Sequence, residues 1–259
     1  MPQPKPDTLV LVGVQYVFDN LVLLERRAIL VRYITSCSLP AWLVFSRQLY
    51  FTGVQSVSIV MLSAALIGFG FVSAIDGFTD AISGETVLDL FALLVARSLG
   101  VVITGFVFVA RSISAIASEM TLLVVTGELR TLARLGIESG PYLLYPRVLA
   151  SALAVMVLSV LFFISALWAA GFALAGRLDV QFFERVLTNL NPSIVFSGFI
   201  RAGLFAGLSV LWVQRFAVRG RRSFTEVPIG ASMAVLQSIV LFLILELVYQ
   251  LSFEASFSP

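Results

Sequence analysis

Long apolar segments separated by polar ones dominate the pattern of the chain. A helix needs roughly 20 mostly apolar residues to cross the hydrocarbon core of a bilayer. Five segments reach this length, approximately residues 53–75, 87–109, 148–175, 193–213 and 228–251. Each is continuously apolar instead of alternating, which favours helices over strands. The pattern therefore predicts an all-α polytopic membrane protein with five transmembrane helices.

The segment before the first of these helices, residues 7–32, has a mixed pattern. Apolar positions such as Leu9 and Val12 are interrupted by charged ones such as Asp19 and Glu25. A sixth membrane span is one interpretation, but it would place Asp19 in the middle of the bilayer. An interfacial amphipathic helix on the cytoplasmic face fits the pattern better. We therefore expect a single domain, in which residues 1–46 form a tail and an interfacial helix and residues 47–259 form the five-span bundle.

A polar segment, residues 110–147, separates the second and third apolar segments. Its charges, small residues and prolines are atypical of a membrane span, so we expect a helical connector on the cytoplasmic side. Within it, leucines recur at three-residue spacing and two arginines lie one turn apart on another face: Leu129, Leu132, Leu135, Arg130 and Arg134. This spacing predicts a short amphipathic helix over residues 126–135 that ends at Gly136. Such a helix could lie on anionic headgroups or dock in a groove of a partner, and the spacing alone does not decide between them.

The distribution of arginine and lysine predicts the orientation. Membrane proteins carry more of these residues in their cytoplasmic loops. On the predicted cytoplasmic side lie Lys5, Arg26, Arg27, Arg32, Arg47, Arg111, Arg130, Arg134, Arg147, Arg215, Arg219, Arg221 and Arg222, and on the opposite side Arg177 and Arg185. We therefore expect a multi-pass membrane protein with an odd number of spans, a cytoplasmic N-terminus and a C-terminus on the opposite side of the membrane.

The amino-acid composition argues against several classes of function. Hydrophobic residues make up 59% of the 259 residues and charged residues 12%, and the mean hydropathy is +1.00. Histidine is absent and Cys37 is the single cysteine, which argues against common metal sites and against His-based catalysis. The net charge of +2 gives no indication of nucleic-acid binding. No phosphate-binding loop motif occurs, so we expect no cofactor and no enzymatic activity, and any uphill transport needs a partner ATPase or an ion gradient.

Three charged residues fall inside the predicted spans: Arg97, Arg201 and Glu246. Each costs about 2.5–3.5 kcal/mol at a helix centre on insertion scales, so such groups pair, reach water or line a pathway. We expect them to form a polar cluster, with Arg201 close to Glu246. The cluster could be a structural ion-pair network, a substrate contact, or both.

Short motifs spread over the chain, from about residue 47 to residue 247, occur in a specific order. They are Arg47-Gln48-Leu49-Tyr50, Gly53-Val54, Gly68, Ser83-Gly84-Glu85-Thr86, Arg97-Ser98-Leu99-Gly100-Val101, Arg111, Ala115, Glu119, Thr126-Gly127-Glu128, Pro146-Arg147, Arg201 and Glu246. In order and spacing these motifs resemble the MlaE/YrbE family, the permease subunits of lipid-transporting ABC systems. The chain departs from the family pattern at Ser98, where the family has Glu, at Val101, where it has Pro, and at Gly127 in the coupling segment.

The resemblance implies a fold, partners and site residues. It implies that the helix between the second and third spans is a coupling helix that docks on a separate ATPase, and that the substrate is phospholipid or a related lipid. It also implies a second permease copy or a paralogue, and a periplasmic MCE-domain protein that exchanges the lipid. With the orientation above, it implies a multi-pass protein of the bacterial inner membrane whose C-terminus is periplasmic. The lipid pocket would lie at the dimer centre and include the intramembrane charges. The residues that the resemblance assigns to ATPase coupling are Glu119, Glu128, Leu129, Arg130, Leu132, Arg134 and Leu135.

Two other classes of function remain open from the residues themselves. An ion-coupled secondary transporter would use Glu246 with Arg97 or Arg201 as a relay, although the sequence has no inverted repeat and an odd number of spans. A scaffold that anchors other subunits without transporting anything is the other alternative.

Overall fold

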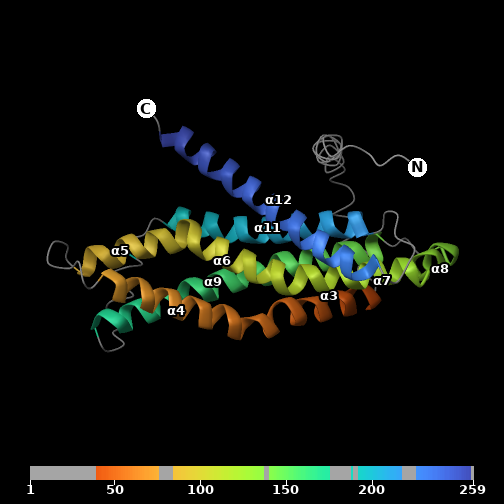
Figure 1. Ribbon diagram of the computed structural model, residues 1–259, viewed down its shortest axis with the longest axis horizontal. Coiled ribbons are helices and arrows are strands. Elements are labelled where there is room, and N and C mark those ends of the chain that lie inside the picture. Colours follow the sequence, from red (N-terminus) through yellow and green to blue (C-terminus); the bar gives the residue numbers. More distant parts are fainter. Residues whose placement is uncertain are drawn as a thin grey trace. The chain divides into compact units, whose positions relative to one another are not determined.

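The computed structural model describes residues 39–75, 84–136, 140–175, 188, 192–217 and 226–257 (Figure 1). Within these residues the secondary structure is helical and contains no strand. The same residues include five helical segments that are long and apolar enough to cross a membrane: Trp42–Ala74, Asp89–Val125, Tyr142–Ala173, Pro192–Phe216 and Val227–Ser252. The predicted all-α, five-span class is confirmed. The predicted interfacial helix, residues 7–32, lies outside the described residues.

Short 3₁₀ and π segments interrupt the first two membrane segments. The first consists of α3 (Leu39–Thr52), the 3₁₀ turn η2 (Val54–Ser56) and α4 (Val57–Ile75). The second consists of α5 (Gly84–Leu94), the π turn η4 (Val95–Leu99), α6 (Gly100–Phe108), the π turn η5 (Val109–Ile113) and α7 (Ser114–Val125). The remaining elements are α8 (Glu128–Arg134), the π turn η6 (Gly140–Leu144), α9 (Tyr145–Ala175), α11 (Pro192–Ala217) and α12 (Glu226–Phe257).

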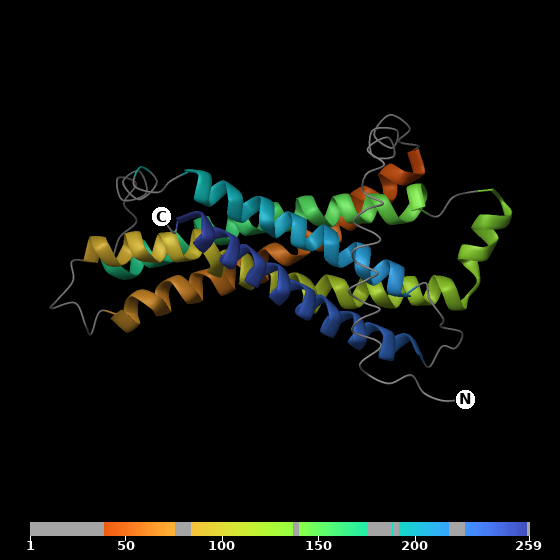
Figure 2. The same cartoon turned by 90° about the horizontal axis from the view of Figure 1, so that it is seen from above.

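Helix α9 packs against both α4 and α11 (Figure 2). Lipid tails are as apolar as leucine, so helices in a membrane associate through close packing and small residues at their interfaces. Gly68 on α4 follows this principle, because a Cβ at this position would collide with the backbone carbonyl of Ala166 on α9. Likewise, a Cβ at Gly198 on α11 would lie 2.6 Å from the carbonyl oxygen of Ala96.

Buried aromatic rings fill the space between the helices. Phe91 and Phe162 belong to the apolar cluster of α4, α5, η4 and α9. Phe205 and Phe242 belong to a second cluster, formed mainly by α6, α7, α11 and α12, and their ring centroids lie 4.4 Å apart. Large apolar side chains such as Leu204 and Leu236 are exposed on the outside of the helices. This distribution is typical of a bundle whose outer face contacts lipid.

The structure corrects the expectation for the first part of the connector. Residues 110–125 do not leave the bundle, because the second membrane segment continues to Val125. Ile113, Ile116 and Met120 are buried in this part of the helix. Its charged residues, Arg111 and Glu119, have partners on neighbouring elements, and that tertiary pairing is not visible in a local polar pattern.

The predicted short helix exists and is α8, at one end of the bundle beyond α7 (Figure 2). Gly127, between α7 and α8, has a φ of 78°, a left-handed conformation that side chains with a Cβ rarely adopt. This turn lets the chain leave the direction of α7. Gly136 also has a positive φ, 72°, two residues after the last residue of α8, and the predicted helix stop at this glycine is confirmed.

The limits of the spans also differ from the sequence-based ones. The first helical segment begins in α3 at Leu39, ahead of the expected first span, and the third membrane segment begins at Tyr142. Pro146 lies in the first turn of α9, directly after the π turn η6. The division of the chain at residue 46 stays a prediction.

Candidate functional site

The three charged residues that the sequence places inside the spans meet in one cluster. Nη1 of Arg201 on α11 lies 3.5 Å from Oε1 of Glu246 on α12, and both side chains are mostly buried. Nη2 of Arg201 donates a hydrogen bond to the backbone carbonyl of Arg97 in η4. The expected proximity of Arg201 and Glu246 is confirmed.

A side chain that the sequence analysis did not select, Gln250 on α12, joins the cluster together. It accepts a hydrogen bond of 3.2 Å from Nη2 of Arg97. Its amide nitrogen donates to Oγ of Ser98 at 2.8 Å and to Oε1 of Glu246 at 3.2 Å. Gln250 could have been found from its spacing, since it lies one helical turn after Glu246 in an otherwise apolar segment.

Tyr249 is a second residue that the sequence analysis missed. The Cζ atom of the Arg201 guanidinium lies 3.8 Å from the centroid of the Tyr249 ring, a cation–π contact. The hydroxyl of Tyr249 is 3.2 Å from Oγ of Ser197 on α11. Together with the ion pair, these contacts fasten α12 to α11 at the cluster.

The π turn η4 presents Arg97 and Ser98 to the cluster. A π turn contains an extra residue relative to an α-helix, and such turns are frequent at functional sites. The string Val-Ala-Arg-Ser occurs in η4 with Arg97 and again in η5 with Arg111. In both turns the arginine bonds to another membrane segment, Arg97 to Gln250 and Arg111 to Gln55. The two turns therefore share a local sequence and the same kind of intersegment bond.

The cluster contains more positive than negative charge. Two arginines face one glutamate, and Nε and Nη1 of Arg201 make no hydrogen bond within the described residues. Oε2 of Glu246 is also buried and lacks a hydrogen bond to the described part of the chain. Buried polar groups without partners are costly in an apolar medium. The arrangement can therefore bind an anionic group that also offers a donor or brings water.

Helix α8 carries most of the residues assigned to coupling, and none of its residues is buried. Leu135, which follows the helix, is 69% exposed, whereas Leu129 and Leu132 are partly covered. Glu128 in the first turn and Arg134 in the last turn match the sign of the helix dipole at each end. The apolar and basic positions of α8 are thus accessible to another molecule.

Glu119, the remaining residue assigned to coupling, lies apart from α8 within the second membrane segment. Its Oε1 forms an ion pair of 2.7 Å with Nη2 of Arg147 on α9. Arg147 is buried, with only 6% of its side chain exposed, while Glu119 is half exposed. The pair links α7 to the first turns of α9, close to the end of the bundle that carries α8.

Comparison with known proteins places these features in a family. Residues 45–252 match the family described as Permease MlaE, which covers the polar cluster, α8 and the Glu119–Arg147 pair. The chain belongs to the MlaE permease family. It is a multi-pass membrane protein, since its described part contains five helices able to span a bilayer.

Three known proteins illustrate the relatives of this chain, and each shares about a quarter to a third of its aligned residues with it. The intermembrane phospholipid transport system permease protein MlaE of Haemophilus influenzae is 34% identical over 66% of the chain and 67% of its own length. The chloroplast protein trigalactosyldiacylglycerol 1 of Arabidopsis thaliana is 32% identical over 47% of the chain and 35% of its own length. A probable ABC transporter permease protein of Rickettsia felis is 26% identical over 61% of the chain and 63% of its own length.

Proposed function

We propose that the chain is the permease subunit of an ABC transporter that moves phospholipid or a related lipid between the inner membrane and a periplasmic MCE-domain protein. A separate ATPase supplies the energy, and the permease itself makes and breaks no covalent bond. The observation that carries the proposal is the polar cluster of Arg97, Arg201 and Glu246 in a chain of the MlaE permease family. The relative from Haemophilus influenzae, named for phospholipid transport, supports the choice of substrate.

The polar cluster is suited to the headgroup of a lipid in an apolar surrounding. A lipid phosphate carries negative charge, and arginine binds phosphate oxygens with several hydrogen bonds. Nε of Arg201, which makes no hydrogen bond within the described residues, is the donor that such a headgroup would use. The exposed apolar side chains around the cluster, such as Leu243 and Leu247 on α12, would contact the acyl chains.

Helix α12 also supports a second permease copy or a paralogue as a partner. In its membrane segment only 17% of the most apolar window is buried within the chain. The helix therefore has a long free apolar face next to the polar cluster. In our proposal this face borders a pocket between two permease subunits, and lipid enters that pocket.

Helix α8 is proposed as the docking element for the ATPase. It lies outside the bundle, and its leucines and arginines are accessible to a partner. An amphipathic helix that lies in a groove is a common mode of recognition. The Glu119–Arg147 ion pair would transmit a displacement of α8 and α7 to α9. We further propose, from the arginine distribution, that the N-terminus and α8 are cytoplasmic and that the C-terminus is periplasmic.

Reconstitution with the ATPase tests the proposal. The permease and its proposed ATPase partner are placed in liposomes with a fluorescent phospholipid, and transfer to the proposed MCE-domain protein is followed with and without ATP. We expect transfer that requires ATP and persists when a protonophore removes the proton gradient. Transfer by the permease alone that follows an ion gradient would instead identify a secondary transporter. Assembly of all subunits without transfer in either condition would identify a scaffold.

A further inference from the structure

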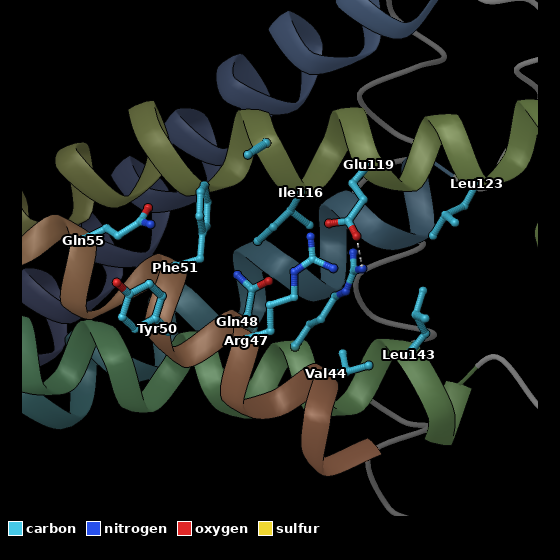
Figure 3. Close-up of a pocket in the computed structure, with 12 residues that line it drawn as sticks. Val44, Arg47, Gln48, Tyr50, Phe51, Gln55, Ile116, Glu119, Leu123 and Leu143 are labelled. Atoms are coloured by element: carbon cyan, nitrogen blue, oxygen red, sulfur yellow. Dashed lines mark hydrogen bonds and ion pairs between the residues drawn. The ribbon is translucent and has the colours of Figure 1, made fainter. Parts of the chain in front are cut away.

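A cleft at the level of the Glu119–Arg147 pair is separate from the polar cluster described above. It has a volume of about 560 Å³ and lies between α3, η2, α7 and the start of α9 (Figure 3). This size lies within the roughly 300–1,000 Å³ that is usual for small-molecule sites. Figure 3 shows Arg47 from α3 and Glu119 from α7 pointing into the space between these two helices.

The charges around the cleft are predominantly positive. Arg47 and Arg147 line it together with one acid, Glu119. Arg111 adds a further positive charge at one end, where its Nη2 donates to Oε1 of Gln55 at 2.9 Å. Arg111 also lies 5.8 Å from the ring centroid of Phe51, which lines the cleft. An anion in the cleft would therefore meet an excess of guanidinium groups.

One of these guanidinium groups has an unused donor. Nη2 of Arg147 is paired with Glu119, but its Nη1 is buried and has no hydrogen-bond partner within the described part of the chain. A buried donor without a partner costs about 1–3 kcal/mol, and more for a charged group. Because only 6% of the Arg147 side chain is exposed, bulk water does not readily compensate for this loss. Arg147 lines the cleft, so its guanidinium adds positive charge that an anion there would partly compensate.

The rest of the lining is largely apolar, which identifies the kind of anion. The apolar side chains in the cleft are Val44, Phe51, Ala115, Ile116, Leu123 and Leu143. A free phosphate would gain nothing from these walls and would lose hydration against them. A lipid would place its phosphate at the arginines and an acyl chain or its glycerol along the apolar wall. Basic pockets between transmembrane helices are known as sites for anionic lipid headgroups.

The geometry points to a binding site for the phosphate group of an anionic membrane phospholipid in the cleft of Arg47, Arg147 and Glu119. It is a site distinct from the Arg97–Arg201–Glu246 cluster. Arg47 donates to the phosphate, the guanidinium of Arg147 adds positive charge beside it, and Leu123 contacts the apolar part of the lipid. Because Arg147 also holds Glu119, a bound lipid would tie the surrounding membrane leaflet to the junction of α7 and α9.

Photocrosslinking within the full-length chain tests this site directly. A photoreactive benzoylphenylalanine replaces Leu123, and the protein is placed in nanodiscs that contain phosphatidylglycerol or diacylglycerol with the same acyl chains. We expect an adduct with phosphatidylglycerol that is at least about tenfold more abundant than the adduct with diacylglycerol. R47Q should reduce the phosphatidylglycerol adduct by about tenfold, since a hydrogen bond to a charged group contributes about 1.5–3 kcal/mol. R147K, which keeps a positive charge for Glu119 but has fewer donors, should also reduce the adduct.

Two controls separate the cleft from general lipid contact and from loss of charge. Benzoylphenylalanine at Leu204, which is 61% exposed on the outside of α11, should capture both lipids equally and should not respond to R47Q. R134Q removes the same charge from α8 and should leave the adduct at residue 123 unchanged. The inference is wrong if R47Q has no effect or if both lipids are captured equally at residue 123. Loss of the adduct when millimolar inorganic phosphate is present before and during irradiation would also overturn it, because the site would then bind free anions.

Discussion

At the scale of single residues, this protein places charges in a membrane by giving each of them several partners. Arg201 has an ion pair with Glu246, a hydrogen bond to the backbone of Arg97 and a contact with the ring of Tyr249. An isolated charge at the bilayer centre is costly, but a pair that is also hydrogen-bonded has much of that cost compensated. The cluster is therefore a structural link between α11 and α12, and it retains one donor without a hydrogen bond in the described residues, Nε of Arg201.

Removal of both charges of this pair should cost less free energy of unfolding than the sum of the two single removals. R201A and E246A should each lower the free energy of unfolding by about 3 kcal/mol, because the remaining charge stays buried and unpaired. The double variant should lose less than the sum of both, with a coupling of at least about 1 kcal/mol. Unfolding titrations with a denaturing detergent measure these values. As a control, the losses of unfolding free energy caused by R201A and by truncation of exposed Leu135 should add. A coupling energy near zero between R201A and E246A would contradict the ion pair.

At the scale of helices, close packing at small residues determines which segments lie together. Gly68 lets α4 approach the backbone of α9, whereas Gly70 on the same helix has no atom within 4 Å of the place where a Cβ would be. These two glycines provide a matched pair in one helix. The comparison separates a packing role from the general effect of glycine on helix stability.

G68A should destabilise the protein, while G70A should not. A methyl group at residue 68 meets the carbonyl of Ala166 and forces the helices apart, which typically costs about 1–3 kcal/mol. At residue 70 alanine has room and should stabilise the helix by up to about 1 kcal/mol. Thermal unfolding in mild detergent, followed by size exclusion, measures both. Equal melting temperatures for the two variants would show that the α4–α9 contact is looser than described.

The exposed helix α8 yields a prediction about assembly. L132D should release the proposed ATPase from the membrane complex, because a charge replaces an apolar contact in the groove of the partner. An apolar residue at the centre of an interface often contributes more than about 1 kcal/mol. Affinity purification of the permease, with the ATPase quantified, measures this loss. T131D adds the same charge on another side of α8 and should retain the ATPase, so equal retention by both variants would argue against α8 as the docking element.

At the scale of the whole molecule, the orientation in the membrane connects the proposed sites to the two compartments. The polar cluster lies toward the Asp89 end of the second membrane segment, and α8 follows its Val125 end. If α8 is cytoplasmic, the polar cluster lies nearer to the periplasm, where an MCE-domain protein would exchange lipid. The lipid cleft of Arg47 and Arg147 would then lie near the cytoplasmic leaflet.

Cysteine labelling tests this orientation. In a Cys37→Ser background, cysteines introduced at Asp80 and Ser256 should react with an impermeant reagent in spheroplasts whose inner membrane is intact. A cysteine at Arg221 should react only after that membrane is permeabilised. Labelling is read as a mass shift on a gel. Reaction of residue 221 in intact spheroplasts would reverse the orientation or change the number of spans.

The sequence by itself determined the number and type of the membrane segments. A bilayer requires about 20 consecutive apolar residues per helix, and a stretch of this kind is recognisable in the sequence without knowledge of the fold. Helix α8 was also predictable, because its leucine spacing and the stop at Gly136 are local. The charges Arg97, Arg201 and Glu246 were conspicuous for the same reason, since they interrupt apolar segments.

Only the tertiary structure decided which of these residues meet and where the helices end. Arg97 and its partner Gln250 are separated by 153 positions, so their contact depends on the packing of η4 against α12. Residues 110–125 were expected outside the membrane segments because of their charges. They belong to the second membrane segment because Gln55 and Arg147 on neighbouring segments satisfy those charges. The lipid cleft likewise arises only where α3, α7 and α9 come together, since no local pattern records which helices become neighbours.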